Sequence, residues 1–435
     1  MLKRRALWSG LIVIGVLAAC GDDEPVASPS AATPTTDPSA EESGSDAASE
    51  ESDDGAEPVA EPTDETEPTD ETEPTDETEP TDETEPTDET EPTDEASATD
   101  LTGVCPNPLV LQTDWFPSPE HGYAYGLIGE SGSLDAETGT FSGPLLDTGI
   151  DLEIRAGGPY LGYQPGTSTM FLDDSIHLAY VSTDEAVAAA ADGRPTVAVV
   201  APLEINPQIL MWDPTVHSFD SFADIGASGA TVLYFAGATY IDYMVEAGIL
   251  SRDQVDPSYD GAPARFVAEE GAVVQQGFAT SEPYFYENEL AEWMRPVEYL
   301  LVHDAGFEVY SQPLVVREDA LEELRPCLEA VVPIFQQSVV DHWSDADATS
   351  QLILDIVEDL DSFWVLYPGQ MTYSVETALE LGVVGNGPDD VVGNFDETRM
   401  TEVVDLLKSV LPDVPDELTA ESTYTNEFID SSIGF

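Results

Sequence analysis

The sequence predicts an α/β fold in two lobes for residues 101–435, preceded by an apolar N-terminal segment and a disordered acidic linker. From Pro108 onward, short runs rich in β-branched and aromatic residues alternate with stretches whose apolar residues recur at helical spacing. Such alternation is typical of largely parallel sheets with helices between the strands. Because these 335 residues exceed what one hydrophobic core usually serves, we expect two lobes, with the C-terminal helices packing on the first.

The N-terminus has the organisation of an export signal. Basic residues at positions 3–5 precede an almost uncharged apolar run, residues 6–19, which is too short for a comfortable transmembrane span. The run ends in Leu-Ala-Ala-Cys, which resembles a bacterial lipobox, in which Cys20 is acylated and begins the mature lipoprotein. We therefore expect residues 1–20 to direct export, and acyl chains on Cys20 to hold the protein to the outer face of the cell membrane. The alternative is a plain signal peptide with an incidental cysteine.

Residues 21–100 form a distinct region of Glu, Asp, Pro, Thr, Ser and Ala. The unit Glu-Pro-Thr-Asp-Glu-Thr occurs five times in residues 61–90 and once more, ending in Ala, in residues 91–96. Proline in every unit disfavours helix and strand, and such a composition buries too little apolar surface to offset the entropy of ordering. We expect a disordered stalk whose roughly 80 residues reach about 50 Å or more, since like charges extend a coil. The alternative is an acidic tract that captures cations or basic partners.

The folded part of the chain is itself strongly acidic. Of the 88 acidic residues, 31 lie in residues 1–100, which leaves 57 against nine basic residues in residues 101–435, a formal net charge of −48. Such a surface repels nucleic acid and anionic lipid headgroups, so we expect no nucleic-acid partner. It also suits saline surroundings, where screening weakens repulsion between like charges.

Two cysteines, Cys105 and Cys327, remain once Cys20 is assigned to lipid. In an exported protein, an even pair favours a disulfide over two free thiols. This bond would tie the beginning of the folded domain to a much later helix. CxxC spacings and paired His motifs do not occur in the sequence, so we expect no metal site.

The predicted elements follow from the periodicity of the domain. The predicted strands are residues 109–115, 151–157, 176–183, 196–202, 231–237, 273–279, 298–304 and 310–317. The predicted helices are residues 183–193, 238–249, 281–293, 318–343 and 346–364. Gly193 and Gly248 are expected to end the first two helices, because glycine readily adopts the left-handed conformation that follows a helix.

Several segments occur in an order and spacing that carry a family resemblance. They are "DWFPSPEHGYAYGLIG" (114–129), "IRAGG" (154–158), "LAYVSTDEAV" (178–187), "ATVLYFAGATYIDYMVEAGI" (230–249), "GFATSEPYFYE" (277–287) and "YTNEFID" (424–430). Together they resemble the aminopyrimidine-binding branch of ABC-importer substrate-binding proteins. That branch is related to fungal thiamine-pyrimidine synthases and, more distantly, to nitrate, sulfonate and taurine binding proteins.

The resemblance spans nearly all of residues 105–435. It implies a two-lobed, periplasmic-binding-protein-like clamshell of type II. Lobe 1 would comprise about residues 105–194 and 296–435, and lobe 2 about residues 195–295, with the chain crossing between the lobes near residues 194 and 296.

Candidate ligand-binding residues lie where the predicted strands end, because ligands of open α/β sheets bind beyond the carboxyl ends of the strands. They are Asp114, Trp115, His121, Gly157, Gly158, Thr183, Asp184, Gly237, Thr239, Glu282 and Tyr284. We expect Trp115 to stack on a flat heterocycle, Glu282 to accept from an amine and His121 to donate to a ring nitrogen. The glycines allow the backbone to approach a ligand closely.

Each of these assignments has a structural alternative. Trp115 would also suit core packing, and His121 would suit a partly exposed position with a local hydrogen bond. Glu282 would be a surface residue in a chain so rich in Glu. Thr183 and Asp184 would serve as helix N-caps, since their side chains satisfy free N–H groups.

These features predict a membrane-anchored, extracytoplasmic solute-binding component of an ABC importer. Its partners would be a small-molecule ligand and the permease and ATPase subunits, and we expect a monomer. The ligand would be a small aromatic heterocycle, above all an aminopyrimidine thiamine precursor, because an anion needs Arg or Lys and only Arg155 lies near a predicted loop. The alternatives are a solute-sensing lipoprotein without a transport role and a receptor for a flavin, a sulfonate or nitrate.

We do not expect an enzyme. The related pyrimidine synthases carry a lysine that binds a pyridoxal cofactor and a cysteine-rich iron motif. In residues 101–435 the one lysine is Lys408, in a C-terminal predicted helix, and the cysteines do not cluster. A Gly-x-Ser-x-Gly nucleophile motif does not occur in the sequence either. We therefore expect no cofactor.

Overall fold

The computed structural model describes residues 100–435. The predicted signal peptide, the lipidation site Cys20 and the predicted acidic stalk up to residue 99 lie outside the described residues. Within residues 100–435, no helix has both the length and the apolar character needed to cross a membrane.

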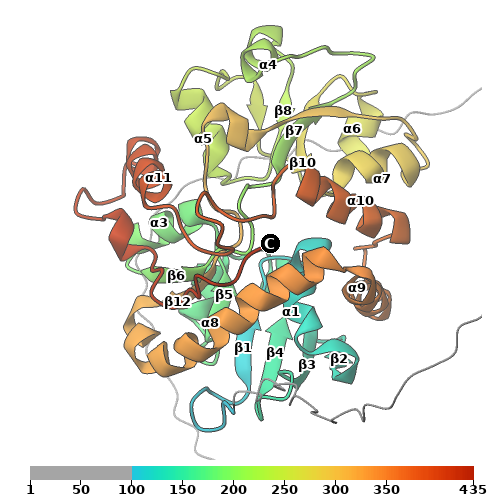
Figure 1. Cartoon of the computed structure of the whole chain (residues 1–435). Helices are drawn as coiled ribbons and strands as arrows, with labels where there is room; N and C mark the ends of the chain where they lie inside the picture. The colour runs from blue at the N-terminus through green and yellow to red at the C-terminus, as the bar shows by residue number, and fades with distance from the viewer. Residues whose placement is uncertain (1–99) are drawn as a thin grey trace, which may run out of the picture. The chain divides into compact units, whose positions relative to one another are not determined.

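A sheet of seven strands lies at the centre of the first lobe (Figure 1). Its order is β2 (Ser133–Asp135), β3 (Thr140–Pro144), β4 (Asp151–Arg155), β1 (Leu109–Gln112), β5 (Leu178–Tyr180), β12 (Leu314–Arg317) and β6 (Thr196–Val200). β1 is parallel to β4 and β5, whereas β12 is antiparallel to both β5 and β6. Every residue of β1, β5 and β6 is buried, which is typical of strands covered on both faces.

A second sheet of five strands forms the second lobe. Its order is β11 (Glu298–Leu301), β7 (Gln208–Trp212), β10 (Val274–Phe278), β8 (Val232–Leu233) and β9 (Val255–Asp256). β8 is parallel to β9 and β10, whereas β7 is antiparallel to both β10 and β11.

The two sheets are built on the same plan. The chain crosses from the first sheet to the second between β6 and β7, and it returns between β11 and β12. In each sheet the strand that follows a crossover, β7 or β12, is antiparallel to both of its neighbours. The predicted fold class, an α/β clamshell of two lobes, is therefore confirmed. Both crossovers lie several residues C-terminal to the predicted positions near residues 194 and 296.

Two long helices pack on the first lobe, as the amphipathic pattern of the sequence predicts. α8 (Leu321–Ser344) contacts β6 and the short helix α1 (Gly122–Gly126), and α9 (Asp347–Asp359) also contacts α1. The face that α8 buries includes Leu328, Val332 and Phe335, which belong to the core of the first lobe. The predicted packing of C-terminal helices on the first lobe is right for α8 and α9.

The last two helices connect the lobes instead. α10 (Pro368–Glu380) contacts α9 and also α7 (Glu282–Asn288) of the second lobe, beside which it lies in Figure 1. α11 (Glu397–Val410) contacts α3 (Thr183–Ala191) of the first lobe and α5 (Thr239–Glu246) of the second. Shorter helices are α2 (Gly166–Met170), α4 (Phe222–Ser228) and α6 (Ala264–Ala268).

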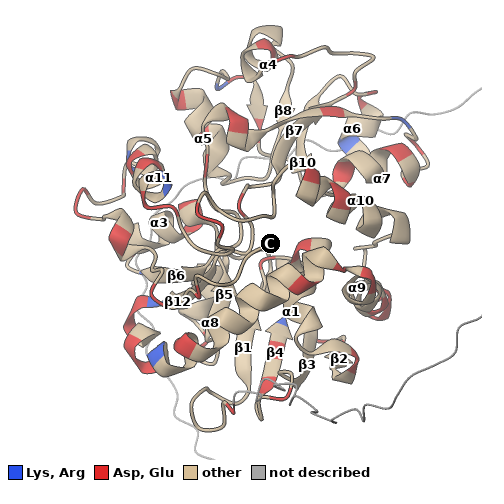
Figure 2. Cartoon of the chain, viewed as in Figure 1, with Lys and Arg blue, Asp and Glu red and all other residues tan. Residues whose placement is uncertain are grey.

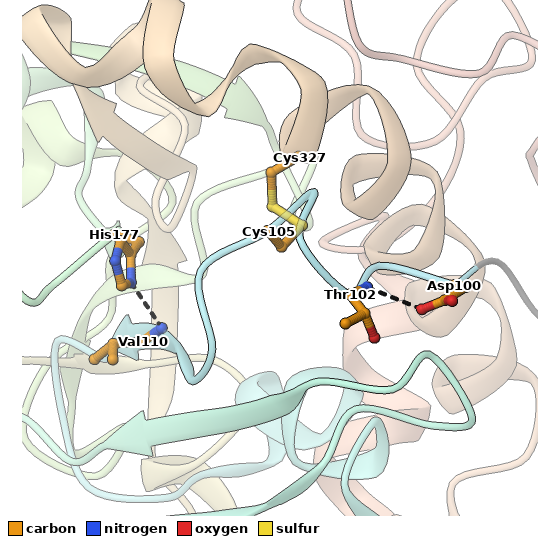
Figure 3. The surroundings of a disulfide bond; sticks show 6 residues. All are labelled: Asp100, Thr102, Cys105, Val110, His177 and Cys327. Carbon is orange, nitrogen blue, oxygen red and sulfur yellow. Dashed lines mark hydrogen bonds between the residues drawn. A yellow bond between two sulfur atoms is a disulfide. The ribbon is translucent and has the colours of Figure 1, made fainter.

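A disulfide joins Cys105, near the beginning of the described chain, to Cys327 in α8, with the Sγ atoms 1.98 Å apart (Figure 3). Both cysteines are buried. In the same region the backbone N–H of Val110, in β1, donates to Nδ1 of His177 at 3.1 Å. The disulfide thus links the two separate chain segments that make up the first lobe.

Candidate ligand-binding site

Asp114 lies in the loop after β1, where two side chains hold its carboxylate. Oδ1 lies 3.0 Å from Nε2 of His121, and Oδ2 accepts a hydrogen bond from Nε2 of Gln312 at 3.0 Å. His121 is fully buried, and its ring stacks on Tyr180 with a centroid separation of 5.0 Å. By contrast, 38% of the Asp114 side chain is exposed. The carboxylate is therefore fixed in orientation while remaining accessible.

Gly157 and Gly158 bring the loop after β4 against the backbone of Asp114. The N–H of Gly157 donates to the carbonyl of Trp115 at 2.9 Å, and the N–H of Gly158 donates to the carbonyl of Asp114 at 3.1 Å. A Cβ on Gly157 would lie 2.4 Å from the carbonyl carbon of Asp114, and Gly158 has a φ of +59°. Glycine suits both the close approach and the left-handed conformation. These glycines therefore shape the loop that carries Asp114 and Trp115.

Trp115 is partly buried and lies among aromatic rings of both lobes. Its ring centroid is 6.0 Å from those of Tyr163 and Trp364, which belong to the first-lobe side of the chain. It is 6.2 Å from the ring of Phe235, which follows β8 in the second lobe. Phe235 in turn lies 4.9 Å from Tyr259. Trp115 therefore packs against the core of the first lobe and also contacts the second.

Glu282 is the first residue of α7, and its side chain turns back on the preceding strand. Oε2 accepts a hydrogen bond from the N–H of Phe278 at 2.7 Å. Burial raises the pKa of Glu282 to about 7, against the lowering effect of that N–H, and the negative charge of Glu120 contributes to the increase. The carboxyl group therefore changes its charge near neutral pH.

Side chains from the first-lobe side of the chain contact the loop that precedes α7. Oγ1 of Thr280 donates a hydrogen bond to the buried carboxyl group of Glu120. The hydroxyl of Tyr373, in α10, donates to the carbonyl of Ala279 at 3.2 Å. The Glu282 loop is thus held directly against the first lobe.

Thr183 and Asp184 lie at the beginning of α3, and both are engaged within the protein. The N–H of Thr183 donates to the carbonyl of Tyr310 at 3.0 Å, and its Oγ1 accepts from the N–H of Tyr310 at 3.2 Å. Asp184 accepts from the hydroxyl of Ser182 at 2.6 Å. Ser182 occupies the N-cap position of α3, so neither Thr183 nor Asp184 is the N-cap residue. Thr183 instead fixes the crossover between β11 and β12.

Three further predicted site residues make their contacts elsewhere than at the carboxylates of Asp114 and Glu282. Gly237 is in an exposed turn with a φ of +88°, and Thr239 is the first residue of α5. Tyr284 packs on Tyr373 with centroids 5.6 Å apart, and its hydroxyl donates to Glu289 at 3.3 Å. Among the described residues, no hydrogen bond joins these three to the carboxylates of Asp114 or Glu282.

Sequence reasoning missed four residues that the structure brings to this junction. Glu120 adjoins His121 in a segment that the family resemblance had already singled out, so it could have been found. Phe235 lies at the end of a predicted strand, where the rule used for Asp114 also applies. Gln312 and Tyr259 carry no local signal. Gln312 also lies in the crossover rather than in a strand, because β12 begins two residues later, at Leu314.

The junction lacks a free guanidinium within residues 100–435. Figure 2 shows acidic residues spread over both lobes and few basic ones. Every arginine in this range forms an ion pair with a carboxylate, namely Arg155, Arg194, Arg252, Arg265, Arg295, Arg317, Arg325 and Arg399. Arg155 is held by Glu153 at 2.7 Å and Asp173 at 3.0 Å. The same part of the chain contains no group of three or more His, Cys, Asp or Glu residues placed to hold a metal ion.

No family model matches the chain, and no curated protein matches it. Among solved structures, it is similar to the alkanesulfonate-binding protein SsuA from Xanthomonas axonopodis pv. citri bound to MOPS. That match has 12% identity and a TM-score of 0.48, and it covers 74% of this chain and 99% of the other.

The chain is also similar to the periplasmic aliphatic sulphonate binding protein SsuA from Escherichia coli, with 14% identity, a TM-score of 0.46, and 73% and 92% of the two chains covered. A third similar structure is the ligand binding component of an ABC-type import system from Staphylococcus aureus with zinc bound. It has 13% identity and a TM-score of 0.47, and the match covers 74% of this chain and 98% of the other. Because these identities are low, the function has to rest on the residues of this chain.

Proposed function

We propose that this protein is a membrane-anchored, extracytoplasmic solute-binding component of an ABC importer, and that it captures a small aromatic heterocycle between its lobes. The observation that carries the proposal is the junction where Trp115, next to Asp114, contacts Phe235 of the other lobe, and where Glu120 accepts a hydrogen bond from Thr280, two residues before Glu282. A ligand that contacts both lobes favours their closed arrangement, since it loses contacts when they separate. Two crossovers allow such a movement without breaking either sheet.

An aminopyrimidine thiamine precursor suits this chemistry best. Trp115 and Phe235 supply aromatic faces for a flat ring, and carboxylates such as Glu282 accept hydrogen bonds from an exocyclic amine. A sulfonate or nitrate would instead need a cationic partner. Arg155, the candidate for that role, is already bound by Glu153 and Asp173.

Binding, rather than catalysis, accounts for the buried histidine of the site. The side-chain hydrogen-bond partners of His121 among the described residues are Asp114 and Gln312, neither of which is a hydroxyl or a thiol. A triad-like site needs such a nucleophile within hydrogen-bond reach of the base. The histidine therefore orients Asp114.

In this proposal, residues 1–20 direct export, Cys20 carries the lipid, and residues 21–100 act as a spacer between the membrane and the lobes. The spacer gives the receptor the reach to meet a permease in the same membrane. Genes for a permease and an ATPase beside this one would distinguish an importer from a solute-sensing lipoprotein.

A thermal-shift measurement on the full chain in molar salt tests the proposal, with aminopyrimidines, thiamine, riboflavin, taurine and nitrate as probes. At a hundredfold excess over Kd, a ligand stabilises the folded state by about 2.7 kcal/mol. We expect an aminopyrimidine to raise the melting temperature of the wild type and of a control variant, Leu172→Ala, whose side chain is 87% exposed. Trp115→Ala should lose the shift. A shift with taurine or nitrate alone would contradict the proposed ligand class, and no shift with any probe would contradict the receptor role.

A further inference from the structure

A chain of aromatic rings leads from Trp115, next to Asp114 on the first lobe, to Tyr259 on the second. Trp115 directly follows Asp114, its ring lies 6.2 Å from Phe235, and Phe235 lies 4.9 Å from Tyr259. Burial raises the pKa of Tyr259 well above its usual value, and the negative charge of Glu282 raises it further. Aromatic faces carry partial negative charge, so this side of the junction attracts cations.

Carboxyl groups close the other side of the junction. The charge of Glu120 acts on Glu282, and Glu120 accepts a hydrogen bond from Thr280 across the lobes. The residue that follows Glu120, His121, contacts Asp114 at 3.0 Å. The loop that carries Asp114 therefore contacts the second lobe twice, through the ring of Trp115 and through the carboxyl group of Glu120.

The described residues offer little positive charge to balance these carboxyl groups. Each arginine is held by a carboxylate elsewhere, and the side chains that contact the Asp114 carboxylate are His121 and Gln312.

We propose that the ligand of this site carries a positive charge, as an organic ammonium or a protonated aromatic amine, held against Trp115 and Phe235 with Asp114 and Glu282 as counter-charges. The inference rests on the proposed function and adds the charge of the ligand. Aromatic faces and carboxylates both favour a cation here, whereas an anion meets unfavourable charge on every side. The ligand enters when the lobes separate and replaces the direct contact between Trp115 and Phe235.

Two pairs of probes that differ mainly in charge test this inference on the full chain by isothermal titration calorimetry. The first pair is an aminopyrimidine with an aminomethyl arm, which is a cation, and its neutral hydroxymethyl analogue. The second is choline and its uncharged carbon isostere, dimethylbutanol. At about pH 8, where Glu282 is largely ionised, we expect the charged pyrimidine to bind at least about tenfold more tightly than the neutral one, as one cation–π contact or one ion pair allows.

Variants test whether the preference for the charged probe comes from Glu282. Glu282→Gln should reduce the charged-to-neutral affinity ratio, whereas Glu287→Gln, an exposed carboxylate on the same helix, should leave it unchanged. Equal affinities for the charged and neutral pyrimidine would overturn the inference while leaving the proposed receptor function intact. Binding of taurine or nitrate alone, or of no probe, would overturn both. The choline pair on the unaltered protein provides the same comparison if Glu282→Gln does not fold, and tighter binding of dimethylbutanol would count against the inference.

Discussion

Asp114 and Glu282 are carboxylates on opposite lobes, and the protein holds them in different ways. Asp114 has 38% of its side chain exposed, and both of its oxygens meet nitrogen atoms of other side chains, His121 and Gln312, at 3.0 Å. Glu282 accepts one backbone N–H, from Phe278, and burial raises its pKa to about 7. Neighbouring side chains orient the carboxylate of Asp114, whereas burial shifts the pKa of Glu282 and so sets its charge. A site that closes around a ligand can thus use one lobe for geometry and the other for charge.

The lobes also differ in how their chain segments are joined, and this gives the largest expected effect. The first lobe consists of two segments linked by Cys105–Cys327, which lie 222 residues apart, whereas the described part of the second lobe contains no cysteine. Replacing both cysteines by serine should destabilise the protein by about 4 to 5 kcal/mol, because the unfolded chain regains the entropy of a long loop. Denaturant unfolding measures the loss.

Limited proteolysis of the same double variant sharpens that prediction. We expect cleavage to begin in first-lobe segments, near residues 100–108 or in α8, while the second-lobe sheet stays protected. An unchanged unfolding midpoint, or cleavage that begins in the second lobe, would contradict the idea that the disulfide stabilises the first lobe.

The glycines of the two lobes give the next largest contrast. Gly157→Ala places a Cβ 2.4 Å from backbone atoms of Thr113 and Asp114, which cannot move aside cheaply. We expect a loss of about 3 kcal/mol in the free energy of unfolding and weaker ligand binding. Gly237→Ala, its matched control on the second lobe, meets no atom within 4 Å and costs only the strain of a φ of +88°, about 1 kcal/mol. Equal costs for the two variants would show that the loop carrying Asp114 is not constrained as the structure indicates.

Neutral isosteres of the two carboxylates should change stability in opposite directions at about pH 8. Glu282 has a folded pKa of about 7, above its usual 4.5, so its contribution to stability is full below about pH 4.5 and is lost as the pH rises through 7. Glu282→Gln keeps an oxygen for the N–H of Phe278 and should stabilise the protein at pH 8 by about 1 to 2 kcal/mol, an amount reduced by partial exposure. The titratable groups facing it are Glu120, Tyr259 and Tyr286.

Asp114→Asn should instead destabilise the protein by about 1 to 2 kcal/mol, because a neutral amide oxygen accepts the hydrogen bond from Gln312 more weakly than the charged carboxylate does. Urea unfolding of both variants between about pH 4.5 and 8 distinguishes the stabilising effect of Glu282→Gln from the destabilising effect of Asp114→Asn. The gain for Glu282→Gln should vanish at the acid end of that range. If Glu282→Gln still stabilised the protein at about pH 4.5, the buried charge of Glu282 would not be the source of the gain in stability.

The buried core strands that could be predicted are short, apolar and rich in β-branched residues, as in β6, "TVAVV". β7, "QILMW", is equally buried, yet its continuous apolar run of four residues, 209–212, fits a helix or a strand equally well. β2, "SLD", was missed for the opposite reason, since its exposed outer residues leave almost no apolar pattern. Such strands are defined by the neighbours with which they pair, and these are not visible in a local stretch of sequence.

The same limit applies to the site. Asp114, Trp115 and His121 come from one loop, so a single segment of sequence indicated all three. Gln312 reaches Asp114 across 198 positions of the chain, and the partner of Glu120, Thr280, is 160 positions away. These contacts exist because the crossovers and the lobe junction bring distant segments together. Periodicity and spacing in the sequence predict the helices and strands. Which side chains come into contact depends on how those helices and strands pack together.

Gln312 gives the smallest expected effect and the sharpest test of the orienting role assigned to the first lobe. Gln312→Met keeps the size of the side chain but removes the donor to Asp114, and it should cost about 1 kcal/mol of stability, because water replaces part of the lost bond at an exposed carboxylate. Gln351 makes the same kind of bond to Asp355, at 2.7 Å, on the exposed face of α9. Gln351→Met should therefore change stability by less than about 0.5 kcal/mol. If Gln312 orients Asp114, its variant should also weaken binding of the aminomethyl pyrimidine, whereas Gln351→Met should not. Equal binding by both variants would leave Gln312 as a packing residue of the crossover.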